Sequence, residues 1–93
     1  MQFEWDEEKA EINLKKHGVS FTEAETVWDD YFYVDIYDDE HSVEEDRFLI
    51  IGESSENRLL IVSYTERENR VRIISARELT PKERRDYEQG KFE

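Results

Sequence analysis

The sequence predicts one α+β domain over residues 1–93, with two N-terminal helices, a four-stranded antiparallel sheet and a C-terminal helix in the order ααββββα. Three observations support this fold class. Helix-capping patterns stand near both ends of the chain. Four runs rich in β-branched and aromatic residues lie between them, and short turns join those runs, as in antiparallel sheets. The length suits a single modest core, for which two Trp, five Tyr and five Phe supply apolar area.

A first helix is predicted from Asp6 to His17, after a segment in which Phe3 and Trp5 are core anchors or form a short edge segment. Asp6 is a common N-cap residue, and Gly18 suits the left-handed position that follows a helix. The packed face of this helix is predicted from 3–4 spacing and carries Ala10, Leu14 and His17. His17 is therefore expected on the packed side or at its margin.

A second helix is predicted to begin at Ser20, because Ser20-x-x-Glu23 is a capping-box pattern. Its apolar face carries Phe21, Ala24 and Trp28. Asp29 and Asp30 are expected to end this helix, since acidic residues are unfavourable at a helix C-terminus.

The four predicted strands cover residues 31–37, 47–53, 59–67 and 70–77. Residues 38–46 form a strongly acidic connection, which is predicted to be a loop or a mobile flap, and residues 54–57 are turn material. Thr80, Pro81 and Glu83 then suit the N-cap, first and third positions of the last helix, which Gly90 ends.

The last two strands are predicted to form a hairpin with a two-residue turn at Glu68-Asn69. This register sets Arg67 opposite Arg70, Glu66 opposite Val71, Tyr64 opposite Ile73 and Leu60 opposite Arg77. One face then carries Leu60, Val62, Tyr64, Glu66, Val71, Ile73, Ser75 and Arg77. The other carries Leu59, Ile61, Ser63, Thr65, Arg67, Arg70, Arg72, Ile74 and Ala76.

Arg67, Arg70 and Arg72 thus cluster on one face at the hairpin tip. Like charges opposite each other cost stability, so they need either an acidic neighbour from this chain or an anionic ligand such as phosphate. Both explanations stay open, because the chain contains 25 acidic residues. Glu66 beside Arg67 suits a general base with a cation that stabilises negative charge, and it equally suits a surface ion pair.

The net charge of −12 is unevenly distributed along the chain. Residues 1–46 hold 16 acidic and 3 basic residues, whereas residues 58–85 hold 8 basic and 4 acidic residues. The whole protein should be repelled by nucleic acid at long range, while a local basic surface still permits binding. The chain has no cysteine, no apolar run of about 20 residues and no signal-peptide pattern, which suits a reducing cytoplasm without a membrane.

The two histidines, His17 and His41, show no metal-site spacing. His41 stands in the acidic connection, where carboxylates favour its charged form, so it is predicted to be a charged structural histidine. The acidic run lacks EF-hand spacing, so no metal is predicted. His17 is either a helix-terminus residue or a catalyst.

Several stretches of this chain occur together in a fixed order. They are Phe3-Glu-Trp-Asp6, Lys9, Asn13-Leu-Lys-Lys-His-Gly-Val-Ser-Phe21, Ala24, Asp38-x-x-His41-Ser, Glu45-x-Arg47-Phe, Ile51-Gly52, Tyr64-Thr-Glu-Arg67, Arg70-x-Arg-Ile-Ile-Ser-Ala-Arg77 and Glu83-Arg-Arg-x-Tyr-Glu88. In this combination the chain resembles the BrnT family of type II toxin–antitoxin toxins over nearly its whole length.

The resemblance implies a RelE-like α+β ribonuclease that inhibits translation and needs neither metal nor cofactor. RNA cleavage by such toxins uses the 2′-hydroxyl as nucleophile. It also implies a BrnA-like antitoxin with a ribbon-helix-helix half, which neutralises the toxin and alone contacts operator DNA.

The resemblance also suggests roles for particular residues, which we state as hypotheses. Glu66 or His17 is the general base, and Arg67 and Arg77 stabilise the scissile phosphate. Tyr64 stacks on a base or donates a hydrogen bond. The remaining RNA-binding candidates are Lys16, Arg70 and Arg72.

The predicted register places Glu66 and Arg77 about five residues apart, roughly 17 Å at the usual strand rise. Three arrangements are therefore open. The hairpin is bulged or coiled, or Arg77 is structural, or Arg77 joins the Lys16–His17 helix end while Glu66 is peripheral. The rival functional class is a non-catalytic module whose acidic half binds a basic partner, or a degenerate toxin that serves only as an operon co-repressor.

Overall fold

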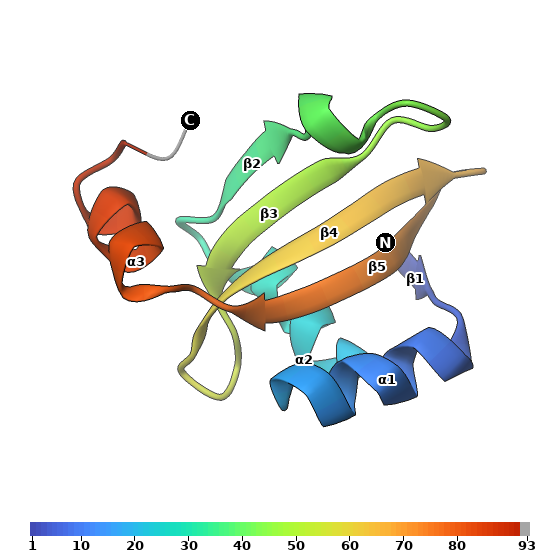
Figure 1. The fold of residues 1–93 in the computed structure, drawn as a ribbon, viewed down its shortest axis with the longest axis horizontal. Helices are drawn as coiled ribbons and strands as arrows, with labels where there is room; N and C mark the ends of the chain where they lie inside the picture. Colours follow the sequence, from blue (N-terminus) through green and yellow to red (C-terminus); the bar gives the residue numbers. More distant parts are fainter. Residues whose placement is uncertain (92–93) are drawn as a thin grey trace.

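The structure, a computed structural model, describes residues 1–91 and confirms the α+β class. Its elements are β1 (Gln2–Glu4), α1 (Glu7–His17), α2 (Phe21–Glu25), the 3₁₀ helix η1 (Thr26–Asp29), β2 (Val34–Tyr37), the 3₁₀ helix η2 (Asp39–His41), β3 (Phe48–Glu53), β4 (Leu59–Arg67), β5 (Arg70–Glu78) and α3 (Pro81–Glu88). α1 runs beside β5, and α3 follows at the end of the sheet where β5 ends (Figure 1). Within residues 1–91, no helix is both long and apolar enough to cross a membrane.

The sheet has five strands in the order β1-β5-β4-β3-β2, so the prediction of four antiparallel strands is wrong. The extra strand is β1, which pairs in parallel with the start of β5 and sets Phe3 beside Val71. The remaining pairs are antiparallel, as predicted. Three residues are too few to show a strand periodicity, so the sequence indicated only an edge segment here.

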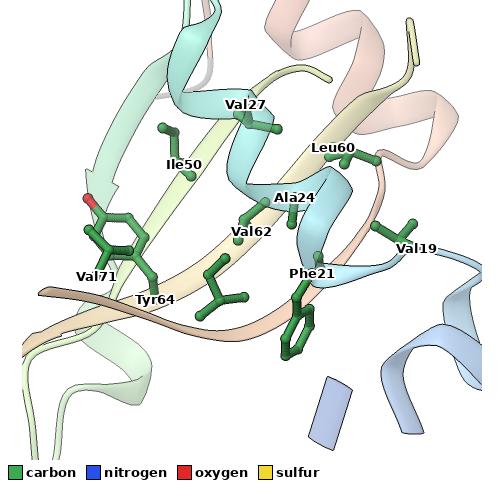
Figure 2. Close-up of a cluster of buried hydrophobic side chains, with 11 residues drawn as sticks. Val19, Phe21, Ala24, Val27, Ile50, Leu60, Val62, Tyr64 and Val71 are labelled. Atoms are coloured by element: carbon green, nitrogen blue, oxygen red, sulfur yellow. The ribbon is translucent and has the colours of Figure 1, made fainter. Parts of the chain in front are cut away.

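One face of the sheet, here called the inner face, packs against α1, α2 and η1. The buried cluster consists of Val19, Phe21, Ala24, Val27, Ile50, Leu60, Val62, Tyr64, Val71, Ile73 and Ala76 (Figure 2). The registers explain why its strand residues share a face: Ile50, Val62 and Ala76 lie opposite one another, as do Tyr64 and Ile73, and Leu60 and Val71 stand on the same side by alternation. The opposite face, called the outer face, carries Leu49, Ile61, Ser63, Thr65, Arg67, Arg70, Arg72, Ser75 and Arg77.

The predicted N-caps of all three helices and the end of α1 are confirmed. The Asp6 side chain accepts hydrogen bonds from the first turn of α1, and Gly18 follows the helix with φ +68°. Ser20 caps α2, and Thr80 and Glu83 form the complete capping box of α3.

The predicted end of the second helix at Asp29-Asp30 is wrong for the α-helix, because α2 ends at Glu25 and Thr26–Asp29 form η1. The last helix ends at Glu88, with Gln89 as its C-cap, before the predicted Gly90. The predicted packed face of α1 is wrong in one respect. Leu14 is 49% exposed, whereas Asn13 is the buried residue of this helix.

The second strand begins later than predicted, at Val34 instead of Tyr31. Residues 31–33 instead form a turn that Asp30 holds, because its carboxylate accepts hydrogen bonds from the backbone N–H groups of Phe32 and Glu53. Tyr31 is 91% exposed as a result. Aromatic composition therefore overestimated the length of this strand.

The hairpin turn is confirmed, since Glu68 and Asn69 both have positive φ, as a two-residue primed turn requires. The predicted partners of Arg67, Glu66 and Tyr64 are also correct. Beyond Tyr64 the register shifts by one residue, and Ser63 pairs with Ser75 instead of Ile74. Ile74 is thus an extra residue in β5, which is a β-bulge. The predicted pairing of Leu60 with Arg77 is wrong, because Leu60 pairs with Glu78 and Ile61 with Arg77.

Candidate functional site

The bulge at Ile74 moves Arg77 from the predicted face of the hairpin to the other one. Because side chains alternate along a strand, one added residue reverses the side of every residue that follows. Arg77 therefore shares the outer face with Arg67, Arg70 and Arg72, while Glu66 points to the inner face. The predicted common face of Glu66 and Arg77 is wrong for this reason.

Arg77 is held in a fixed orientation by α3. Its Nη1 and Nη2 atoms donate to the two carboxylate oxygens of Glu83 at 2.7 and 3.0 Å, and Nη1 also donates to the Glu78 carbonyl at 3.1 Å. These hydrogen bonds lower the pKa of Glu83 to about 2, and Glu83 raises the pKa of Arg77. Within residues 1–91, the Arg77 Nε–H and one Nη2–H have no acceptor, so they remain able to donate to a ligand.

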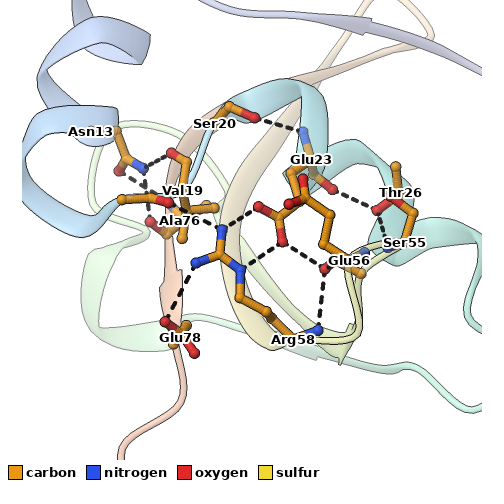
Figure 3. Close-up of polar contacts among 12 residues, drawn as sticks. Asn13, Val19, Ser20, Glu23, Thr26, Ser55, Glu56, Arg58, Ala76 and Glu78 are labelled. Carbon is orange, nitrogen blue, oxygen red and sulfur yellow. Dashed lines mark hydrogen bonds and ion pairs between the residues drawn. The ribbon is translucent and has the colours of Figure 1, made fainter.

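His17 is brought to the same region by Asn13, one turn earlier in α1. The Asn13 amide donates to the carbonyls of Val19 and Ala76 at 3.0 and 2.8 Å, and its oxygen accepts from the Ala76 N–H at 3.1 Å (Figure 3). The side chain thus pairs with β5 as a neighbouring strand would. This anchors the end of α1 beside Ala76, next to Arg77.

The acidic connection is ordered by its own hydrogen bonds. Ser42 Oγ donates to the Asp38 carbonyl at 2.6 Å and accepts from the Arg47 N–H at 2.9 Å. His41 Nδ1 lies 2.9 Å from a carboxylate oxygen of Asp38. Further along, the hydroxyl of Thr65 donates to the Asp46 carbonyl at 2.6 Å. The sequence left open a loop or a mobile flap. The structure shows a loop that contains one 3₁₀ turn and is held by hydrogen bonds.

These segments enclose a pocket of about 330 Å³ on the outer face, here called the outer pocket. It is lined by His17, Asp38, Glu40, His41, Leu49, Ile61, Ser63, Ser75, Ala76 and Arg77. The structure thus brings His17 and Arg77 together, which is the third of the arrangements left open above, in a hairpin that is also bulged. It adds His41, which the sequence indicated only as a structural residue. The spacing Asp38-x-x-His41, which fits one helical turn, was the available signal.

The three arginines at the hairpin tip already have acidic partners. Arg67 pairs with Glu45 at 3.0 Å, and Arg70 and Arg72 pair with the two oxygens of Glu4 at 3.5 and 3.0 Å. Hydrogen bonds from Arg72 and Arg67 lower the pKa of Glu4 and Glu45 respectively. The acidic neighbours expected as one explanation are therefore present. Arg67 and Arg70 remain about half exposed, at 54% and 55%.

The other predicted site residues lie away from the outer pocket. Glu66 is exposed and borders a separate hollow at the hairpin tip with Arg67. Lys16 is exposed in the last turn of α1. Tyr64 is only 5% exposed, and its hydroxyl donates to Asp35 at 2.8 Å. Burial, followed by this hydrogen bond, raises the pKa of Tyr64. Its ring packs against Trp28 and Phe48, so it is not accessible to stack on a base.

The outer pocket combines groups that suit the chemistry of a phosphodiester. Two imidazoles have ring nitrogens that accept or donate a proton, a fixed guanidinium is able to bind a phosphate oxygen, and two serine hydroxyls are able to donate hydrogen bonds. Within residues 1–91, no three His, Asp or Glu side chains are grouped as a metal ion would require.

Comparison with known proteins relates this chain to a protein family and to a solved structure. A family model described as "Ribonuclease toxin, BrnT, of type II toxin-antitoxin system" matches residues 5–83. The crystal structure of the Brucella abortus ribonuclease toxin BrnT is similar with a TM-score of 0.64 and 24% identity, over 86% of this chain and 97% of that chain. No curated protein matches this chain. At this identity the structural likeness shows the fold, and the family model shows the family.

Proposed function

The chain belongs to the BrnT family of ribonuclease toxins of type II toxin–antitoxin systems, and from this premise we propose that it cleaves RNA in the outer pocket without a metal ion. The nucleophile is the 2′-hydroxyl of the RNA itself. Cleavage of cytoplasmic RNA then inhibits translation.

One observation supports this proposal above the others: His17 and Arg77 line one pocket although 60 positions separate them in the sequence. Asn13 anchors the helix end that carries His17, and Glu83 anchors the Arg77 side chain. Two elements that are fixed independently thus place their side chains at one site, which suits catalysis because reacting groups are then positioned before the substrate arrives.

In the proposed reaction His17 is the general base that removes the 2′-hydroxyl proton. Arg77 donates its remaining N–H groups to the phosphate and stabilises the negative charge that grows on it. A carboxylate already fixes the guanidinium, so binding requires little further ordering of this side chain. Ser63 and Ser75 lie in the same pocket and supply further hydrogen-bond donors.

Arg67, Arg70 and Arg72 extend the basic surface along the same outer face. We assign them to the RNA backbone on either side of the cleaved bond. RNA phosphates must then replace Glu4 and Glu45 as their partners, which is a nearly balanced exchange of one anion for another. These arginines should therefore contribute more to salt-dependent binding than to the chemical step.

The proposed partner is a ribbon-helix-helix antitoxin of the BrnA type, which neutralises the toxin and alone contacts operator DNA.

One observation favours a second candidate function. All three arginines at the hairpin tip are satisfied within this chain, as expected of a module that binds a basic partner or serves only as a co-repressor. The two functions differ in whether the isolated chain cleaves RNA.

The test is to incubate the purified chain with an RNA transcript, with and without excess EDTA. Cleavage that is unaffected by EDTA and leaves 2′,3′-cyclic phosphate ends supports the proposal. Induction in bacteria should arrest growth, and co-expression of the antitoxin should prevent the arrest. Absence of cleavage together with normal growth would reject the ribonuclease function and leave the binding module.

A further inference from the structure

His41 lines the outer pocket but has no part in the reaction described so far. We propose that His41 is the general acid of the reaction, which protonates the departing 5′-oxygen, and that Asp38 is its positioning residue. This inference rests on the proposed ribonuclease function and adds the second proton-transfer group.

The turn that bears His41 is built to hold one orientation. The Asp38 N–H donates to the Arg47 carbonyl at 2.8 Å, which ties η2 to the start of β3. Ser42 closes the turn through its bonds to Asp38 and to Arg47. The Asp38 side chain is 12% exposed and lies 2.9 Å from Nδ1 of His41. A carboxylate accepts only from a protonated nitrogen, so Nδ1 carries the proton in this arrangement.

The other ring nitrogen of His41 is left for the substrate. The His41 side chain is 58% exposed while its Asp38 partner is nearly buried, so the ring is held on one side and open on the other. A histidine oriented by a carboxylate on one nitrogen is a recurrent device for proton transfer through the second nitrogen.

The reaction requires two proton transfers. An electron pair of the 2′-oxygen forms the new O2′–P bond, and the 2′-hydroxyl proton passes to His17. The P–O5′ bond breaks with its electron pair on the 5′-oxygen, which takes a proton from His41. The products are a 2′,3′-cyclic phosphate end and a 5′-hydroxyl end, and no oxidant or further reactant is needed.

The assignment of the acid to His41 follows from its neighbours. Serine hydroxyls and the Arg77 guanidinium do not release protons near neutral pH, whereas an imidazolium does. Asp38 is an ion-pair partner for the charged ring, and Glu40 adds a second carboxylate to the same pocket. These anions balance the imidazolium before it gives its proton to the leaving group.

The experiment compares two versions of one RNA oligonucleotide, cut at the same linkage. In one the leaving atom is the natural 5′-oxygen, and in the other it is a bridging 5′-sulfur. A thiolate departs without protonation, so a general acid matters only for the oxygen substrate. His41→Ala should slow cleavage of the oxygen linkage by at least about 100-fold and leave the sulfur linkage near the wild-type rate. His17→Ala should slow both.

Asp38→Asn should show the same pattern with a smaller effect, because His41 remains but loses its orientation. Asp39→Asn is the matched control, since Asp39 is the exposed neighbouring acid and does not line the pocket. Circular dichroism and the thermal midpoint show whether each variant is folded.

Two outcomes overturn the inference while the ribonuclease function stands. In one, the wild type cleaves both substrates and His41→Ala matches it on both. In the other, folded His41→Ala slows both linkages equally, which is the signature of a structural role. If the folded wild type cleaves neither substrate, the proposed function itself fails, and this inference fails with it.

Discussion

Arg58 and Arg77 each pair with a glutamate through two hydrogen bonds, yet the two pairs lie on opposite faces of the sheet. Arg58 follows the β3–β4 turn and contacts both carboxylate oxygens of Glu23 in α2 (Figure 3). Arg77 contacts both oxygens of Glu83 in α3. The link between them is β5, because Arg77 and Glu78 are adjacent and Glu78 lies 3.5 Å from Arg58.

The two pairs differ in what surrounds the carboxylate. The Glu23 side chain is 2% exposed and also accepts from the Ser54 hydroxyl at 2.6 Å, while Arg58 further donates to the Gly18 carbonyl at 3.0 Å. These contacts lie on the inner side of the sheet and join α2 to the β3–β4 turn. The Arg77 side chain is 38% exposed and borders the outer pocket. Its Nε–H and one Nη2–H have no acceptor within the described residues. One kind of ion pair thus stabilises a junction on one face and orients a candidate catalytic group on the other.

The largest expected difference concerns stability. Glu23→Gln should lower the free energy of unfolding by about 3 kcal/mol, because it breaks a pair whose carboxylate is buried. Glu83→Gln should lower it by only about 1 kcal/mol, because the Arg77 end is partly solvated. Urea unfolding of both variants measures the difference. Equal losses would remove the distinction between the two pairs.

Asn13 provides the next test, because it connects the inner face to the outer pocket. Asn13→Ala should cost about 2 kcal/mol, since the N–H and carbonyl of Ala76 lose their partner. The folded variant should also cleave RNA more slowly, because His17 is no longer anchored. Leu14→Ala on the exposed side of α1 is the control for helix propensity. A folded Asn13→Ala protein with full activity would show that His17 needs no such anchor.

Lowering the pH should reveal how much the ionised Glu83 carboxylate contributes to the free energy of unfolding. Hydrogen bonds from Arg77 lower the pKa of this carboxyl from 4.5 to about 2. The stability that it contributes is therefore present above pH 4.5 and is lost as the pH falls toward 2. The difference in unfolding free energy between the wild type and Glu83→Gln should shrink over that window. A difference that stays constant from pH 5 to pH 2 would contradict this origin.

The smallest effect is expected from the arginines at the hairpin tip. Arg67→Ala and Arg72→Ala should each reduce the slope of log affinity against log salt for single-stranded RNA by at most about 0.7. Arg85→Ala, an exposed position of α3, should leave the slope unchanged. Filter binding over a range of KCl concentrations gives the slopes. Unchanged slopes in both tip variants would place the RNA elsewhere.

The sequence predicted most of what depends on local chemistry. Helix caps at Asp6, Ser20 and Thr80 and the primed turn at Glu68-Asn69 depend on neighbouring residues, and the structure confirms them. The parallel strand β1 was missed, because its pairing joins residues about 68 positions apart through only three residues.

The candidate site was predicted only in part, because a single extra residue in β5 determines the face on which Arg77 lies. The extra residue Ile74 reverses the face of Arg77, and regular alternation has no means of placing a bulge. Two adjacent isoleucines, Ile73 and Ile74, interrupt the alternation and were the available signal. Asn13 had a similar signal, since 3–4 spacing places it between Ala10 and His17 on the packed face. His41 reaches the pocket through a loop whose path depends on the hydrogen bonds of Asp38 and Ser42 with Arg47, which no regular sequence pattern indicates.

The most direct test of the outer pocket as the active site compares Arg77→Ala with Arg67→Ala in single-turnover RNA cleavage at saturating protein. Saturation removes differences in binding, so the measured rate reports the chemical step. We expect Arg77→Ala to be slower than the wild type by about 100-fold or more, the size of a lost transition-state contact. Arg67→Ala should stay close to the wild-type rate. The reverse order would place the chemistry at the hairpin tip and contradict the assignment of the outer pocket.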